Sequence, residues 1–191
     1  MKLVFATNNS NKLKEVQAML SDIQLLKLTD INCTEDIPET STTIAGNAIQ
    51  KINYLTTNYK VDGFADDTGL EVEALNGEPG VYSARYAGED KSANANMNLL
   101  LEKLSVHNNK KARFITVIAL NLNGEQHVFE GICEGKIIHQ QRGNKGFGYD
   151  PIFIPNGFDK TFAEMTLEEK AQISHRGKAV RKLIRFLNQL D

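Results

Sequence analysis

The sequence has little of what marks several classes of protein. Its 191 residues include only two cysteines, far apart and outside any C-x-x-C pattern, so neither a disulfide framework nor a cysteine zinc site is supported. The apolar run 3–6 is too short for a signal-peptide core, and the longest one, 114–122, falls well short of the roughly 20 residues that a membrane helix needs. A net charge of −2 gives no general reason to bind nucleic acid. We therefore expect a soluble cytoplasmic protein with two reduced thiols, and neither a nucleic-acid nor a membrane partner.

No repeat, low-complexity tract or linker rich in proline or serine divides the chain, so one folding unit over 1–191 is expected, in two lobes. Its 41% hydrophobic and 24% charged residues are typical of a globular protein. Apolar residues at helical spacing alternate with short runs of strand character, and Asn123-Gly124 is a hairpin turn signal. Thr166 and Glu169 form a capping box. The mixture of hairpin and crossover connections predicts an α/β fold with a mixed sheet.

The elements expected from these patterns follow in chain order. Strands are predicted at 3–6, 25–28, 70–74, 112–121 and 127–134. Helices are predicted at 13–20 (about three turns), 44–55, 97–104, a short segment after Thr166, and 180–190. The segment 142–155, which contains three glycines and two prolines, is predicted to be a constrained loop.

A polar turn follows the first predicted strand and opens a helix. A helix N-terminus carries unpaired backbone N–H groups and the positive end of the dipole, which favour a phosphate. The residues of this turn are Thr7, Asn8, Asn9, Ser10, Asn11 and Lys12. It lacks the glycines of a Walker loop. Asn and Ser are also good N-caps, and taken alone the turn favours simple capping without a ligand.

An acidic pair, Asp66-Asp67, stands before Thr68-Gly69 and after a short apolar run. A carboxylate here could hold Mg²⁺ or take a proton from an attacking water. Adjacent residues of an extended chain point to opposite sides, so one of the two is expected to face a substrate. The alternative is a turn in which the side chains bond their own backbone.

Two later segments carry further candidates. In the glycine-rich loop 143–151, Phe147 or Tyr149 could stack on a flat base, although a rigid turn with an aromatic in the core explains the same pattern. In the basic C-terminal segment, His175 and Arg176 enter the last helix where an anion site can form. The other basic side chains of that helix are expected to be solvated.

Five segments in this order resemble the inosine triphosphate pyrophosphatase family, also known as dITP/XTP pyrophosphatases. They are Phe5-Ala6-Thr7-x-Asn9-x-x-Lys12, Ala65-Asp66-Asp67-Thr68-Gly69-Leu70, the run 79–86, Gly146-Phe147-Gly148-Tyr149-Asp150-Pro151, and Glu169-Lys170-x-x-x-Ser174-His175-Arg176-Gly177. The resemblance covers essentially the whole chain. It implies a long mixed sheet flanked by helices, two lobes with an active-site cleft between them, a homodimer and Mg²⁺.

The resemblance also implies roles for individual residues. Asp67 corresponds to the catalytic aspartate and metal ligand, and Glu39 to a metal-binding glutamate. The turn 7–12 would bind the triphosphate, and Thr68 would contact the substrate. The residues implied at the base and sugar are Phe147, Gly148, Tyr149, Asp150, Lys170, His175 and Arg176, of which Arg176 and Lys170 are the candidates for a donor to a 6-oxo purine.

One departure concerns the metal. Family members commonly have Glu-Asn-Ala where this chain has Gly46-Asn47-Ala48, while Lys51 of the same helix is retained. The expected activity is hydrolysis of non-canonical purine triphosphates such as ITP, dITP and XTP to the monophosphate and pyrophosphate. The alternatives are a pyrophosphatase for other modified nucleotides and a nucleotide-binding module without catalysis.

Overall fold

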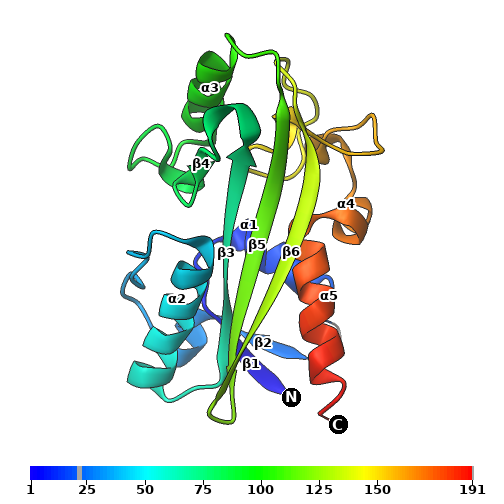
Figure 1. Ribbon diagram of the computed structural model, residues 1–191. Coiled ribbons are helices and arrows are strands. Elements are labelled where there is room, and N and C mark those ends of the chain that lie inside the picture. The colour runs from blue at the N-terminus through cyan, green and yellow to red at the C-terminus, as the bar shows by residue number, and fades with distance from the viewer. Residues whose placement is uncertain (21–22, 191) are drawn as a thin grey trace. The chain divides into compact units, whose positions relative to one another are not determined.

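The computed structural model describes residues 1–20 and 23–190 as a mixture of helices and strands (Figure 1). The helices are α1 (Ser10–Gln17), α2 (Ile44–Tyr59), α3 (Ala93–Leu104), α4 (Leu167–Ile173) and α5 (His175–Leu187). The strands are β1 (Lys2–Phe5), β2 (Gln24–Leu26), β3 (Gly63–Val72), β4 (Pro79–Gly80), β5 (Lys111–Leu122), β6 (Glu125–Ile137) and β7 (Phe153–Pro155). They form one sheet in the order β2-β1-β3-β5-β6-β7, and β4 pairs with β3.

The sheet contains both kinds of strand pairing. β1 is parallel to β2 and to β3, whereas β3 with β4 and β6 with β7 are antiparallel. At the turn between β5 and β6, Asn123 and Gly124 have φ values of 52° and 84°, the positive pair that a tight hairpin needs. The predicted mixed α/β fold and the hairpin are therefore confirmed.

The chain divides into two compact units. Unit 1 comprises Met1–Asp67, Thr116–Gly131 and Arg176–Asp191, and unit 2 comprises Thr68–Ile115 and Ile132–His175. β3, β5 and β6 each contribute residues to both units. The single bilobed domain and its active-site cleft stay predictions.

In unit 1 the sheet has helices on both faces. Ile118 and Leu120 of β5 belong to the same buried cluster as Val180 and Leu183 of α5. The intervening side chains of β5 point the other way, and Asn121 donates through Nδ2 to Asn53 and Thr56 of α2, each at 3.0 Å. α2 and α5 therefore cover opposite faces of the sheet in this unit (Figure 1).

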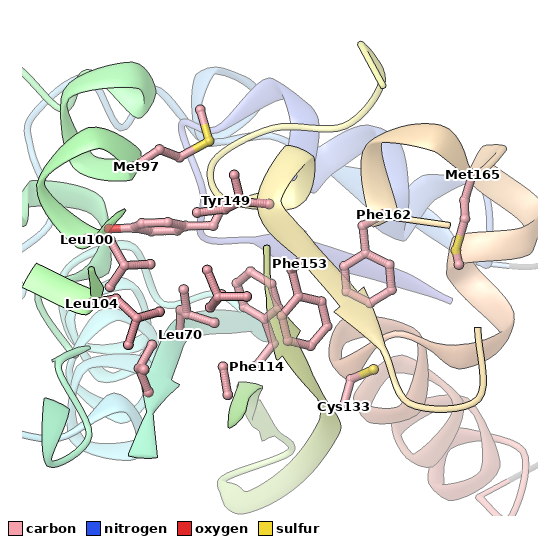
Figure 2. Packing of buried hydrophobic residues seen from close by; sticks show 14 residues of the cluster. Leu70, Met97, Leu100, Leu104, Phe114, Cys133, Tyr149, Phe153, Phe162 and Met165 are labelled. Carbon is pink, nitrogen blue, oxygen red and sulfur yellow. The ribbon is translucent and has the colours of Figure 1, made fainter. Parts of the chain in front are cut away.

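Unit 2 has its own apolar core (Figure 2). The rings of Phe114 and Phe153 meet edge to face with centroids 4.8 Å apart, and Leu100 and Leu104 of α3 are fully buried in the same cluster. Burying a side chain of this size contributes about 1.5–3 kcal/mol, so the cluster is a main source of stability for the unit.

Several predicted boundaries were wrong. β2 ends at Leu26, because Leu28 begins a 3₁₀ turn, and α1 has eight residues instead of about three turns. Leu190 lies beyond the end of α5 and is 52% exposed. The predicted loop 142–155 ends in a short strand, since β7 pairs with β6. The capping box is confirmed: Thr166 and Glu169 exchange hydrogen bonds at the start of α4. None of the helices in 1–20 and 23–190 is long and apolar enough to cross a membrane.

Candidate functional site

The turn between β1 and α1 is organised by its own side chains. The Oδ1 atom of Asn9 accepts the backbone N–H groups of Asn11 and Lys12 at 2.9 and 3.1 Å, so Asn9 is the N-cap of α1. Thr7 Oγ1 accepts the N–H group of Asn9 at 3.2 Å. The capping interpretation is confirmed for Asn9, and phosphate binding by the turn stays a prediction. Its exposed members are Asn8, Asn9, Ser10 and Asn11.

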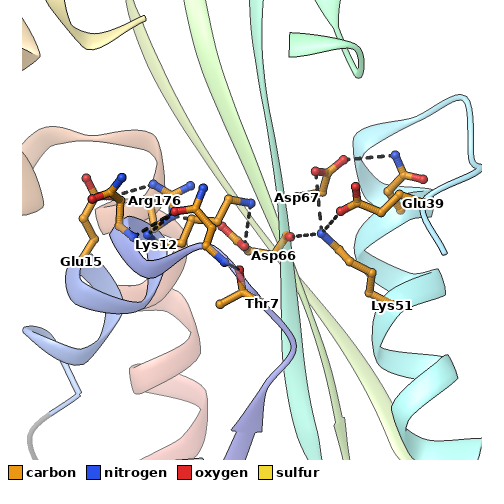
Figure 3. A network of polar contacts seen from close by, with 11 residues as sticks. Thr7, Lys12, Glu15, Glu39, Lys51, Asp66, Asp67 and Arg176 are labelled. Carbon is orange, nitrogen blue, oxygen red and sulfur yellow. Dashed lines mark hydrogen bonds and ion pairs between the residues drawn. The ribbon is translucent and has the colours of Figure 1, made fainter. Parts of the chain in front are cut away.

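The acidic pair lies inside a strand. β3 runs without interruption from Gly63 to Val72, so the alternative of an Asp-Asp-x-Gly turn was wrong. The extended backbone turns Asp66 and Asp67 to opposite sides, as predicted: Asp66 faces Lys12, and Asp67 faces Lys51 (Figure 3). Both carboxylates belong to unit 1.

Asp66 is a buried carboxylate with a cation on each oxygen. Lys12 Nζ donates to Oδ1 at 2.9 Å, and Arg176 Nε donates to Oδ2 at 3.0 Å. Burial alone would raise the pKa of Asp66, but the charges of Lys12 and Arg176 hold it well below its usual value. Asp66 is therefore an ionised carboxylate whose charge is balanced within the protein.

On the other side of β3, two carboxylates gather around one lysine. Lys51 Nζ donates to Glu39 Oε1 and to the Asp66 carbonyl, each at 2.6 Å, and lies 3.9 Å from Asp67 Oδ1. Burial lowers the pKa of Lys51, but Asp67, Asp66 and Glu39 outweigh it, so the pKa is raised and the ammonium stays charged. Burial raises the pKa of Asp67 against the attraction of Lys51, which suits a carboxylate that accepts a proton.

A buried amide fixes the orientation of Asp67. Asn47 is 2% exposed, and its Oδ1 atom accepts the N–H group of Ser41 at 2.8 Å. Its Nδ2 atom donates to Asp67 Oδ2 at 3.3 Å. Asn47 thus ties the catalytic candidate to the start of α2 and to the segment that carries Glu39.

The donor set suits Mg²⁺. Hard carboxylate oxygens are the ligands that Mg²⁺ prefers, and it is usually held by one or two of them with waters and substrate phosphates. Glu39 and Asp67 both lie within 4 Å of the Lys51 ammonium and can approach one cation. Among residues 1–20 and 23–190 no group of three or more His, Cys, Asp or Glu side chains could hold a metal ion. A magnesium site formed by Glu39 and Asp67 stays a prediction.

Gly46 is closely packed by the residues before α2. A Cβ atom at this position would lie 1.9 Å from Ser41 Oγ, 2.8 Å from Ser41 Cβ and 2.8 Å from Thr43 Oγ1. Ser41 and Thr43 therefore occupy the space in which a side chain at position 46 would begin.

In unit 2, the glycine-rich loop surrounds a buried ion pair. Lys170 Nζ lies 2.5 Å from Asp150 Oδ2, and the same oxygen accepts the N–H group of Phe147 at 2.9 Å. The Lys170 ammonium is 5.0 Å from the centre of the Phe147 ring, a cation–π arrangement. Gly146, with φ of 71°, passes so close to Asp150 that a Cβ would lie 2.1 Å from Oδ2. The predicted residues 147, 150 and 170 are brought together.

Three other predicted site residues of unit 2 are buried or half-buried and are packed against the rest of the protein. Tyr149 is 5% exposed within the core, and its hydroxyl donates to the Ser83 carbonyl at 2.9 Å, so an aromatic tucked into the core describes Tyr149 (Figure 2). His175 is buried and stacks on Phe114 with centroids 4.5 Å apart. Thr68 is half-buried in β3. Phe147 and Gly148 are half-buried, and base stacking stays a prediction for Phe147.

The comparisons with known proteins agree with this arrangement. Residues 3–186 of the chain match the Ham1 family. The chain belongs to the Ham1 family. It is 62% identical over 188 residues to a dITP/XTP pyrophosphatase of Flavobacterium johnsoniae, covering 98% of each sequence. The family resemblance recognised in the five sequence motifs is thereby confirmed.

Solved structures give the same result. The Ham1 protein of Staphylococcus aureus superposes with a TM-score of 0.91 at 41% identity, covering 100% of both chains. A nucleoside-triphosphatase / dITP/XTP pyrophosphatase of Mycobacterium abscessus gives a TM-score of 0.78 at 41% identity, covering 96% of this chain and 98% of the other.

Sequence reasoning missed one part of this Ham1-family site. Arg176, predicted at the base, belongs to unit 1, where its guanidinium contacts Asp66 and Glu15. Glu15 was not a candidate at all. The available signal was its position three residues after Lys12, which places both side chains on one face of α1.

Proposed function

We propose that this Ham1-family chain hydrolyses non-canonical purine triphosphates (ITP, dITP and XTP) to the monophosphate and pyrophosphate. The observation that carries the proposal is the polar cluster of Asp67 on β3, Asn47 and Lys51 on α2, and Glu39 in the segment before α2. The Lys12 ammonium lies on the other side of β3, bound to Asp66. The relatives named dITP/XTP pyrophosphatases support the substrate class. A homodimer and a cytoplasmic location belong to the same proposal.

The residues of unit 1 have complementary roles in this reaction. When bound by Glu39 and Asp67, Mg²⁺ would supply positive charge against the phosphates. Asp67 orients a water and accepts its proton as the oxygen attacks phosphorus. The bond between the α and β phosphates then breaks, and pyrophosphate leaves toward Lys12 and the turn 7–12. Lys51 keeps Glu39 and Asp67 together and adds a fixed charge.

The purine end is assigned to residues of unit 2. Phe147 offers a ring for stacking, and Lys170, a donor without acceptor function, suits the 6-oxo group of hypoxanthine or xanthine. The 6-amino group of adenine cannot accept that hydrogen bond, so a site built around it rejects adenine. Both candidate donors are ion-paired, Arg176 with two carboxylates of unit 1 and Lys170 with Asp150. Lys170 is the preferred candidate because its ammonium lies 5.0 Å from the centre of the Phe147 ring, the proposed stacking face.

A panel of triphosphates with Mg²⁺, followed by phosphorus NMR, tests the proposal. Inosine monophosphate and pyrophosphate are expected as first products, with ITP, dITP and XTP cleaved faster than ATP and GTP. Inosine diphosphate as the first product would contradict the proposed bond cleavage. Binding without turnover would favour the non-catalytic module, and faster cleavage of modified pyrimidine triphosphates would favour the other enzyme.

A further inference from the structure

Arg176 joins two carboxylates that lie far apart in the sequence. Its NH1 atom donates to Glu15 Oε2 at 2.5 Å, and its Nε atom donates to Asp66 Oδ2 at 3.0 Å. The side chain of Arg176 is 2% exposed, that of Glu15 12% and that of Asp66 1%. A charge so deeply buried must be balanced by partners inside the protein.

Together with Lys12 these residues form a chain of alternating charge: Glu15, Arg176, Asp66 and Lys12 (Figure 3). Asp66 uses one oxygen for Arg176 and the other for Lys12. Arg176 and Asp66 alone would not pair in this way, because a guanidinium binds a carboxylate best through two parallel hydrogen bonds to both oxygens. Glu15 takes the NH1 end of Arg176, which leaves one oxygen of Asp66 for Lys12.

We propose that Glu15 is a positioning residue for the phosphate-binding lysine. By holding Arg176, it keeps one Asp66 oxygen bound to Lys12, and so fixes the Lys12 ammonium beside the turn 7–12. Without the carboxylate of Glu15, the Arg176 guanidinium would donate two parallel hydrogen bonds to the two oxygens of Asp66 and displace Lys12. The inference rests on the proposed function in one respect, the binding of the leaving pyrophosphate by Lys12.

A double-mutant cycle on the full-length protein tests the proposal. Glu15→Gln keeps the size of the side chain and removes its charge, and Lys12→Met removes the ammonium. The first readout is the dissociation constant for inorganic pyrophosphate with Mg²⁺, measured by calorimetry, which needs no turnover. The second is kcat and KM for ITP. Gln17→Ala, an exposed change on the same helix, is the control and should leave both unchanged.

If Glu15 acts through Lys12, the effects of Glu15→Gln and Lys12→Met on the free energy of pyrophosphate binding are not additive. Glu15→Gln should weaken pyrophosphate binding about tenfold in the wild-type background and hardly at all once Lys12 is replaced. Multiplicative effects, or a Glu15→Gln variant that loses only thermal stability, would overturn the proposal. Glu15→Asp keeps the charge but is one methylene shorter, and it completes the same cycle if the Gln variant does not fold.

The outcomes separate this inference from the proposed function. Coupled effects on pyrophosphate binding in a protein that does not cleave ITP would leave the positioning role standing and overturn the proposed function. Cleavage of ITP with independent effects at Glu15 and Lys12 would do the reverse.

Discussion

At the scale of single residues, the two neighbouring aspartates have different tasks because consecutive strand positions face opposite sides. Asp67→Asn keeps the size of the side chain and its contact with Asn47 but removes the charge and the proton acceptor. We expect kcat to fall by on the order of 100-fold or more, with little change in thermal stability. Steady-state kinetics with ITP, alongside a melting curve, measure both. Hydrolysis at nearly the wild-type rate would show that Asp67 is not the catalytic carboxylate.

Whereas Asp67→Asn should lower the activity of the protein, Asp66→Asn should lower its stability. The substitution leaves Arg176 and Lys12 in a buried network that lacks one of its two carboxylates, and breaking such a network costs about 3–5 kcal/mol. Chemical denaturation should show this loss in the free energy of unfolding, whatever the activity. The matched control is Glu71→Gln. Glu71 lies in the same strand but forms a half-exposed ion pair with Arg113, so its loss should change the free energy of unfolding by less than about 1 kcal/mol. A stability loss no larger than that of the control would contradict the charge balance inferred for Asp66.

Phe147 and Lys170 should separate affinity from selectivity. Stacking on an aromatic ring is worth about 1–3 kcal/mol but tolerates any base, so Phe147→Ala should lower kcat/KM for ITP and ATP by similar factors. Lys170→Met removes the donor and should lower the ITP value far more, which compresses the ratio of the two. An unchanged ratio in Lys170→Met would place the selectivity elsewhere.

At the scale of elements, α2 is fastened to the segment before it by an exposed carboxylate. Glu35 Oε1 accepts the hydroxyl of Tyr59 at 2.5 Å and that of Tyr54 at 2.9 Å. The Tyr59 hydrogen bond is the largest of the causes that lower the pKa of Glu35 from 4.5 to about 2. Four residues later the same segment carries Glu39, so this contact helps to place a predicted metal ligand.

The pH dependence follows from that lowered pKa. Because the folded state favours the ionised form of Glu35, its stabilisation is fully present above pH 4.5 and is lost as the pH falls toward about 2. Tyr59→Phe removes the main cause, so its stability should be lower than wild type at pH 7 and should approach wild type in acid. Urea unfolding of both proteins across this range measures the difference. A difference independent of pH would mean that Tyr59 acts by packing alone.

Elements with strong local signals were predictable from sequence. The hairpin at Asn123-Gly124 and the capping box before α4 are local patterns whose geometry needs no distant partner. β3 was harder, because Asp66-Asp67-Thr68-Gly69 has the composition of a turn. Its extended form depends on Lys12, Lys51 and Arg176, which neutralise the acidic pair from three different helices.

At the scale of the whole molecule, local sequence patterns predicted some parts of the site, whereas parts that depend on contacts between distant positions could not be predicted. Ordered motifs identified the family and the acidic pair, since a motif is a stretch of neighbouring residues. The contact between Glu15 and Arg176 joins positions 161 residues apart, and no local pattern encodes it. The roles of Asn47 and Glu15 therefore emerged only from the folded chain.

The packing around Gly46 has a consequence for substitution at this position. A carboxylate at position 46 requires its neighbours to move, because its first carbon would meet Oγ and Cβ of Ser41 and Oγ1 of Thr43. Any shift of Ser41 that makes room would disturb its Oγ atom, which accepts the Thr43 N–H group at 3.2 Å. Position 46 is thus coupled to Ser41 and Thr43, and a carboxylate introduced there is expected to loosen the start of α2 unless these neighbours change with it.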